Sequence, residues 1–214
     1  MSEQPGLTRT ALSEASDWFL AVVDTITLEQ WSQPGLGEWT VRETVAHAAR
    51  AFVTIEEYFG LPATIEIDSA GVYFAAGMTD PAVHQPVADR GRAAGAELGD
   101  GAELHQLADR VHALVAGADD DQPIATRLGG LAFSEYLRTR VLELTVHTLD
   151  LVDALGVRGE QSDPPASAAK VTVDLLVEVA EARGPAHAAA VIRGLTGRRS
   201  LPPGFNVLGP DVQR

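Results

Sequence analysis

The chain has 214 residues, enough for one domain whose core needs neither disulfides nor a structural metal, and it carries a formal net charge of −14. With 30 aspartates and glutamates against 16 lysines and arginines, it lacks the basic surface that binds a phosphate backbone, so we expect no nucleic-acid partner. The absence of cysteine excludes disulfides, a thiolate nucleophile and cysteine-ligated zinc, so any thiol chemistry must use a thiol from outside the chain.

The first predicted element is an amphipathic helix from Leu7 to about Leu28. Apolar residues recur in it at the three- and four-residue spacing of a helix with one buried face. Ahead of it there is no basic region followed by an apolar stretch, and no segment of the chain reaches the ~20 apolar residues that span a bilayer. We therefore expect a cytoplasmic protein without a membrane partner, as a monomer or homodimer.

A second helix is predicted from Val41 to about Phe59. Thr40 followed by Glu43 matches the capping box, in which each side chain binds a free backbone N–H at the helix start. Residues 60–87 mix glycine, proline and β-branched residues without helical periodicity. This pattern indicates a long connection, with TIEI as a short extended piece, and such connections often border a site.

Helical spacing returns over residues 88–116, with a break expected at GDGA (99–102). The acidic GADDDQP segment after it is interpreted as a solvated loop, because it lacks the alternating ligands and the glycine of an EF-hand calcium loop. A further long helix is predicted from Ser134 to Leu155, and Gly156 is placed to end it.

After a polar, proline-containing linker, two shorter helices are predicted near Ala166–Ala182 and Pro185–Leu195, with an irregular end beyond them. Together these elements predict an all-α fold, an antiparallel four-helix bundle with a long crossover loop. The expected organisation is a bundle over residues 1–160 and a linker with a short helical extension, packed on the bundle, over residues 161–214.

Three side chains on two of these helices form a candidate metal site. Glu143 and His147 are four residues apart, so both project from one side of their helix, and His47 lies at the flank of the apolar face of its own helix. A His/Glu/His set suits zinc or another divalent first-row metal and leaves a coordination position open. The alternatives are a hydrogen-bonded interior histidine at position 47 and a simple polar pair at the other two positions.

Other residues are weighed around this set. Three are candidates to orient the ligands, although the first could serve only as a cap: Glu43, Arg140 and Asp150. Trp39 is interpreted as a packing anchor, with contact to substrate as the alternative. The remaining histidines show no comparable ligand spacing and are expected at the surface: His84, His105, His112 and His187.

Two stretches resemble the signatures of one family. GLGEWTVRETVAHAARAF (35–52) and GGLAFSEYLRTRVLELTVHTLDL (129–151) are similar to the motifs of the mycothiol-dependent maleylpyruvate isomerase family, within the DinB-like four-helix-bundle superfamily. The resemblance covers about residues 7–160 and implies metal ligation by His47, Glu143 and His147. It also implies mycothiol as a thiol cofactor or co-substrate.

The chain departs from the family's characterised isomerase after the bundle. That enzyme continues into a larger domain that contributes to the active site, whereas this chain has only residues 161–214 in that place. The resemblance therefore implies a metal- and mycothiol-dependent transferase or isomerase acting on a small electrophile, rather than maleylpyruvate isomerisation itself. A non-catalytic metal- or ligand-binding bundle and a purely structural partner protein are the alternatives.

The basic C-terminal segment offers further candidates for the site. Arg193, Arg198 and Arg199 gather beside an apolar end in an otherwise acidic chain. One hypothesis is that the end docks on the bundle and holds an arginine near the metal, where it could grip a carboxylate. A solvated basic turn is the alternative. The tentative catalytic residues are thus Arg140, Arg198 and Arg199.

Overall fold

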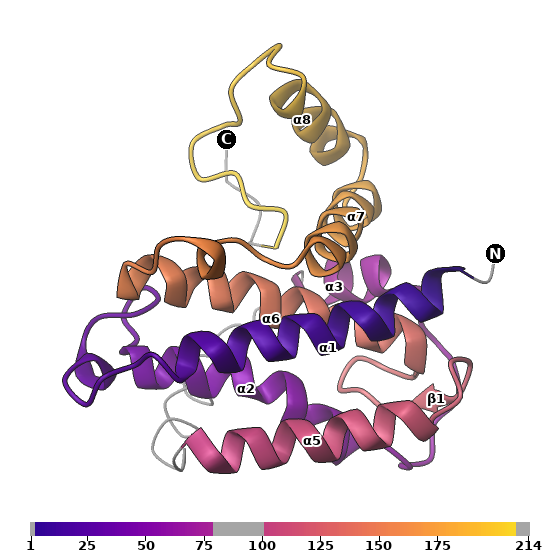
Figure 1. The fold of residues 1–214 in the computed structure, drawn as a ribbon. Coiled ribbons are helices and arrows are strands. Elements are labelled where there is room, and N and C mark those ends of the chain that lie inside the picture. The colour runs from indigo at the N-terminus through magenta and orange to yellow at the C-terminus, as the bar shows by residue number, and fades with distance from the viewer. Residues whose placement is uncertain (1–2, 79–100, 209–214) are drawn as a thin grey trace.

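The computed structural model describes residues 3–78 and 101–208, and its architecture is shown in Figure 1. The described residues form an almost entirely helical fold. Its helices are α1 (Glu3–Val23), α2 (Val41–Tyr58), α3 (Ala70–Met78), α5 (Gly101–Gly117), α6 (Phe133–Leu155), α7 (Ala166–Ala182) and α8 (Pro185–Leu195). Two 3-10 turns, η1 (Gln30–Ser32) and η2 (Glu160–Ser162), and a two-stranded ladder of β1 (Pro123–Ile124) and β2 (Leu131–Ala132) complete it.

The helices α1, α2, α5 and α6 form the predicted four-helix bundle (Figure 1). Each of the four packs on two of the others, and their apolar faces meet in one continuous core. Side-chain contacts fix the directions of α1 and α5. Arg9, near the start of α1, binds Asp120 just beyond the end of α5, whereas Asp24 after α1 binds His105 near the start of α5. This pair is therefore antiparallel, and the all-α bundle expected from the sequence is confirmed.

Two predicted ends of the site-bearing helices are confirmed. Thr40 caps α2, accepting from the Glu43 backbone N–H, while the Glu43 carboxylate accepts from the Thr40 N–H at 2.7 Å. The long helix α6 stops at Gly156, whose φ of 67° lies in the left-handed region that glycine adopts without strain.

The prediction of a non-helical connection over residues 60–87 is wrong in part, because α3 lies within it. The sequence of α3, AGVYFAAGM, is apolar almost all round and so carries no helical periodicity. Its stability comes from tertiary packing: Ala70 and Phe74 are buried against α6 and α7. Residues 79–87 lie outside the described parts of the chain.

The TIEI segment is extended where it meets the β1–β2 turn. Ile67 forms a bridge with Leu131, and the N–H groups of Glu66 and Ile67 both donate to the Gly130 carbonyl, at 2.8 and 3.0 Å. A side chain at Gly130 would have its Cβ 1.8 Å from the Thr64 carbonyl oxygen, so only glycine fits this close approach.

Two helix boundaries differ from the expectation. The first helix ends at Val23 rather than near Leu28, and the chain continues through turns into η1. The third predicted helix begins, within the described residues, at Gly101, inside the expected GDGA break. Residues 88–100, which we also expected to be helical, fall outside the described ranges.

The C-terminal residues pack on the bundle through α7, which contacts α1, α3 and α6. Buried Arg138 of α6 joins these helices, donating to Glu135 at 2.9 Å and to Glu178 of α7. By contrast, α8 packs on α7 and has no buried residue (Figure 1). No helix in the described ranges is long and apolar enough to cross a lipid bilayer.

Replacing Phe52 by alanine tests the bundle core. The side chain is fully buried and its ring lies 6.1 Å from that of Phe19. We expect the free energy of unfolding to fall by ~3–5 kcal/mol, because a large apolar group is lost and a cavity remains. Urea unfolding followed by circular dichroism measures this. Leu195→Ala, at a position that is 77% exposed, is the matched control and should stay within ~0.5 kcal/mol; equal losses in both variants would contradict the assigned core.

Candidate metal centre

The structure brings together the three residues that the sequence nominated. His47 lies on α2, and Glu143 and His147 lie one turn apart on α6. One ligand atom from each lies within 4.8 Å of the others, and His147 Nε2 is 3.2 Å from Glu143 Oε2. The rings of His47 and His147 meet edge to face, with centroids 4.6 Å apart. In the described part of the chain, this is the one group of three or more such side chains with metal-binding geometry.

Packing on both helices holds these side chains in place. His47 stands between buried Ala46 and Ala48 on α2, and Trp39, from the loop before the helix, packs its ring 4.6 Å from the imidazole. Trp39 is itself only partly buried. On α6, the residues next to the ligands, Leu144 and Thr148, are fully buried. Rotation of either helix would therefore expose core, so the site inherits the rigidity of the bundle.

Asp150 orients His147. Its carboxylate lies 3.0 Å from His147 Nδ1, so in the neutral tautomer Nδ1 carries the proton and donates it. The lone pair of Nε2 is then directed to the side on which Glu143 lies. A carboxylate in this position is the usual partner of a metal-binding histidine. Glu43, the other carboxylate considered for this role, is engaged in the cap of α2.

The three ionisable groups have strongly shifted pKa values. Burial, aided by the charge of His147, lowers the pKa of His47 to about 4. Burial acts in the same direction on His147, but hydrogen bonds to Asp150 and Glu143 outweigh it and raise its pKa to about 9. Burial opposes ionisation of Glu143, yet its hydrogen bond with His147 and the charge of Arg140 lower its pKa to about 2. At neutral pH the metal-free centre therefore holds a neutral His47, a protonated His147 and an ionised Glu143.

The donor set fits a divalent cation on two observations. Two imidazole nitrogens and one carboxylate oxygen are the ligands that zinc and its first-row neighbours accept, and three protein ligands leave coordination free for a further group. In addition, Nδ1 of His47 is buried and has no hydrogen-bond partner among the described residues. A buried ring nitrogen without a partner is uncommon unless a ligand supplies one.

The tentative catalytic arginines lie in different surroundings. Arg140 is one turn before Glu143 on α6, is buried, and acts electrostatically on both His47 and Glu143. Arg198 and Arg199 are exposed beyond α8, and Arg198 donates to the Thr196 carbonyl at 2.8 Å. Within the described residues, no hydrogen bond or ion pair links either of them to the three ligands. In the apolar end beyond them, Val207 and Leu208 pack against a buried cluster formed by residues of α3, α6 and α7.

Three tyrosines around Arg140 were not predicted to belong to the site. Tyr136 of α6, Tyr58 of α2 and Tyr73 of α3 all act on the guanidinium. The spacing of Tyr136, four residues before Arg140, was a usable signal, because such pairs share a helix face. Nothing in the sequence pattern pointed to Tyr73, because α3 itself was not predicted.

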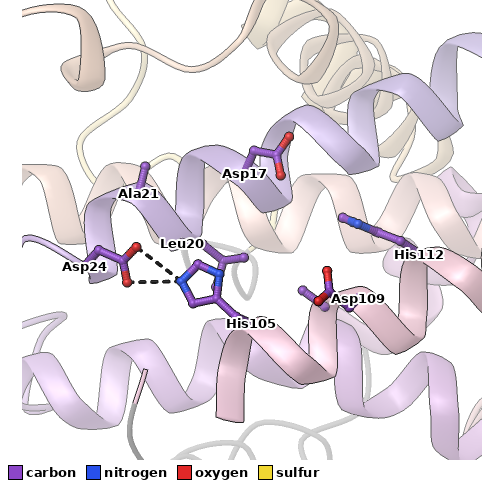
Figure 2. Close-up of a pocket in the computed structure, with 8 residues that line it drawn as sticks. Asp17, Leu20, Ala21, Asp24, His105, Asp109 and His112 are labelled. Carbon is purple, nitrogen blue, oxygen red and sulfur yellow. Dashed lines mark hydrogen bonds and ion pairs between the residues drawn. The ribbon is translucent and has the colours of Figure 1, made fainter. Parts of the chain in front are cut away.

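Of the remaining histidines, His84 lies outside the described ranges, and the other three lie away from this centre. Figure 2 shows a pocket between α1 and α5, where His105 is exposed and lies 3.1 Å from the carboxylate of Asp24. His112 lines the same pocket but is only partly exposed, and its Nε2 is buried without a hydrogen-bond partner among the described residues. His187 is also partly buried, with its ring 6.1 Å from that of Phe205. The prediction that these histidines lie at the surface is therefore confirmed for His105, whereas His112 and His187 are only partly exposed.

Comparison with known families gives one match. The model described as the mycothiol maleylpyruvate isomerase N-terminal domain matches residues 12–152. The matched range begins in α1 and ends in α6, so it contains nearly the whole bundle and all three candidate ligands. Comparisons with curated proteins and with solved structures gave no significant match.

The affinity of this centre for a divalent cation should rise with pH. A cation must displace a proton from His147, whose pKa is raised to about 9, whereas His47 is already neutral and Glu143 already ionised at neutral pH. We expect about a tenfold gain per pH unit from pH 6.5 to 8.5, with release of about one proton per cation. Titration calorimetry with cobalt(II), in buffers of different ionisation enthalpy, measures both quantities.

Asp150→Asn provides the control for this pH dependence. The amide keeps a hydrogen-bond acceptor but removes the charge that helps to raise the His147 pKa. We therefore expect the gain in affinity to level off at a lower pH than in the unmodified protein. An affinity that is independent of pH over this range would contradict the assignment of His147 as a ligand that is protonated in the metal-free protein and loses its proton when the metal binds.

Proposed function

Because the chain belongs to the family of mycothiol maleylpyruvate isomerase N-terminal domains, we propose that it is a divalent-metal-dependent enzyme that uses mycothiol, supplied from outside the chain, to attack a small electrophile. The observation that carries the proposal is the convergence of His47, Glu143 and His147 at a centre that is still partly open. The side chains of Glu143 and His147 keep 25% and 13% of their exposure.

We propose zinc as the metal, held by one ring nitrogen of His47, Nε2 of His147 and the carboxylate of Glu143. A bound divalent cation would lower the pKa of a thiol so that it is a thiolate near neutral pH. Other residues of the protein hold the candidate ligands in place and orient their rings. Asp150 keeps the His147 tautomer, Trp39 fixes the His47 ring, and the buried faces of both helices exclude water from one side.

The reaction type depends on the fate of the thiol. In a transferase, the sulfur forms a bond to an electrophilic carbon, the bond from that carbon to its leaving group breaks, and the leaving group departs with the electron pair. The thiol proton is released, and the thioether leaves as product. In an isomerase, the sulfur adds to one carbon of a double bond that is conjugated to a carbonyl, and the π electrons move onto the carbonyl oxygen. After rotation about the resulting single bond, the C–S bond breaks, the double bond forms again, and the thiol is recovered unchanged. Because the chain contains no cysteine, it cannot supply the sulfur for either reaction. Mass spectrometry of the products distinguishes the two, and stoichiometric metal binding without turnover would favour the non-catalytic binding bundle.

Alanine substitutions of the ligands test the metal assignment. We expect His47→Ala, Glu143→Ala and His147→Ala each to lower metal affinity by about a hundredfold or more while the bundle stays folded, because the core does not include the metal. Elemental analysis of protein purified without a histidine tag gives the metal content, and circular dichroism gives the fold. His105→Ala, a histidine on α5 paired with Asp24, is the control and should keep full occupancy. Full occupancy in all three ligand variants would place the metal elsewhere.

Thiol dependence is the second test. We expect metal-loaded protein to conjugate 1-chloro-2,4-dinitrobenzene only when mycothiol is present, since the chain has no thiolate of its own. The rate should fall to the uncatalysed level when the thiol is omitted or the metal is removed. Turnover of an ester or amide substrate without thiol would instead identify water as the nucleophile and indicate a hydrolase.

A further inference from the structure

Arg140 is a buried cation to which no carboxylate of the described residues is hydrogen-bonded. The residue is only 8% exposed, and within the described residues its guanidinium makes two hydrogen bonds, from Nε to Thr139 Oγ1 at 3.0 Å and from Nη1 to Thr54 Oγ1 at 3.2 Å. Both acceptors are neutral. Removing an arginine from water is costly unless an anion and a full set of acceptors replace the solvent. The described part of the fold supplies no hydrogen-bonded anion and only these two acceptors.

Arg138, two residues earlier on the same helix, shows what a satisfied buried arginine looks like in this protein. Its exposure is 7%, close to that of Arg140, but it is paired with the carboxylates of Glu135 and Glu178. Glu143, one turn away, acts on Arg140 through its charge, but neither hydrogen bond of the guanidinium goes to it. Arg140 therefore keeps N–H groups for which the described residues provide no acceptor.

A second buried group beside Arg140 is also unsatisfied. Tyr136 is 1% exposed, and the Arg140 guanidinium carbon lies 4.8 Å from the centroid of its ring. Thr54 lies near the tyrosine hydroxyl, yet no described residue completes a hydrogen bond with it. The Thr54 hydroxyl itself donates to the Arg50 carbonyl at 2.8 Å. The charged Arg140 guanidinium and the neutral Tyr136 hydroxyl are thus two buried donors near Thr54, and the described residues do not provide enough acceptors for both.

We propose that Arg140 and Tyr136 form a binding site for a carboxylate group of the substrate. A planar carboxylate matches the fork of N–H groups of a guanidinium and can accept the tyrosine O–H as well. The identification of this ligand as the substrate rests on the proposed function; the binding of a carboxylate does not.

The position of the pair relative to the metal ligands defines the kind of substrate. Arg140 and Tyr136 lie three and seven residues before Glu143 on α6, and Thr54 lies seven residues after His47 on antiparallel α2. These separations correspond to roughly 5–10 Å along the helix axes. The structure therefore fits a small electrophile whose carboxylate is separated by a short chain from the carbon that the thiol attacks.

Anion binding can be measured without metal or thiol. The probe is 4,4,4-trifluorobutyrate, titrated into metal-free protein and observed by fluorine NMR, with its neutral amide as the comparison. We expect the carboxylate to bind and the amide not to bind. Arg140→Gln should weaken binding by roughly tenfold or more, and Tyr136→Phe by about fivefold, because each removes a donor to the bound anion.

Arg50→Gln is the matched control. It removes the same charge from a partly buried arginine of α2 that also acts electrostatically on His47, and we expect less than about a twofold change. Equal weakening in Arg50→Gln and Arg140→Gln would reduce the effect to general positive charge and overturn the proposal. Displacement of the probe by inorganic phosphate as effectively as by butyrate would also overturn it, in favour of an unspecific anion site.

The melting temperature of the Tyr136→Phe variant shows whether it is folded. Tyr136→Phe deletes only an unsatisfied hydroxyl, so its melting temperature should stay within about 3 °C of that of the unmodified protein. A much larger drop would show that the hydroxyl has a structural partner and would overturn its assignment as a ligand donor.

Kinetics then separate this proposal from the proposed function. In metal-loaded protein with thiol, Arg140→Gln should raise KM for a carboxylate-bearing electrophile and leave KM for its methyl ester unchanged. Carboxylate binding without any thiol-dependent turnover would support the carboxylate site at Arg140 and contradict the proposed enzymatic function. Thiol-dependent turnover without an Arg140-dependent preference for the carboxylate would support the enzymatic function and contradict the carboxylate site.

Discussion

The antiparallel contact between α2 and α6 is the constraint on which the candidate site depends. It sets His47 against His147 at one level and Thr54 against Arg140 two turns away. Neither helix holds a complete site: α6 carries two of the three candidate metal ligands and both proposed carboxylate-binding donors, and α2 carries the third candidate ligand and an acceptor for Arg140. Because both helices bury continuous apolar faces in one core, their register is fixed by packing that involves none of the polar residues. The site can therefore hold unsatisfied groups while the fold stays stable.

The polar groups of α6 divide into a satisfied and an unsatisfied set. Arg138 is neutralised by Glu135 and Glu178, and Glu135 also accepts the N–H of Ala70. This network joins α6 to α3 and α7, which cover the side of α6 that the four-helix core leaves free. On the neighbouring face, Arg140 and the Tyr136 hydroxyl find no such partners among the described residues. Unsatisfied buried groups of this kind are rare in folded proteins, and they concentrate where a ligand completes the bonding.

The electrostatics of the metal centre arise from its three ionisable groups acting on one another. His147 is charged because Asp150 and Glu143 hold its proton, and His47 is neutral because burial and the His147 charge act together. A divalent cation bound at this candidate centre would replace the proton of His147, so two positive charges would stand where one stood, and it would stabilise the Glu143 carboxylate in place of that proton. Metal-free and metal-loaded protein would then differ in the number of bound protons.

Local sequence signals were enough to define the bundle and two ends of its site-bearing helices. They also nominated the three candidate ligands, and the resemblance to the family favoured a metal site over an interior histidine and a polar pair. Helical periodicity, a capping box at Thr40 and a terminal Gly156 are such signals, and the four-residue spacing of Glu143 and His147 places both on one face without any tertiary information. Long-range packing established the other features. The apolar sequence of α3 has no periodicity and becomes a helix by packing on α6 and α7. Arg138 and Arg140 look alike in the sequence, and the fold alone determines that carboxylates from α6 and α7 reach the first and not the second. The reason is that burial and charge pairing depend on residues far apart in the chain, which no local pattern records.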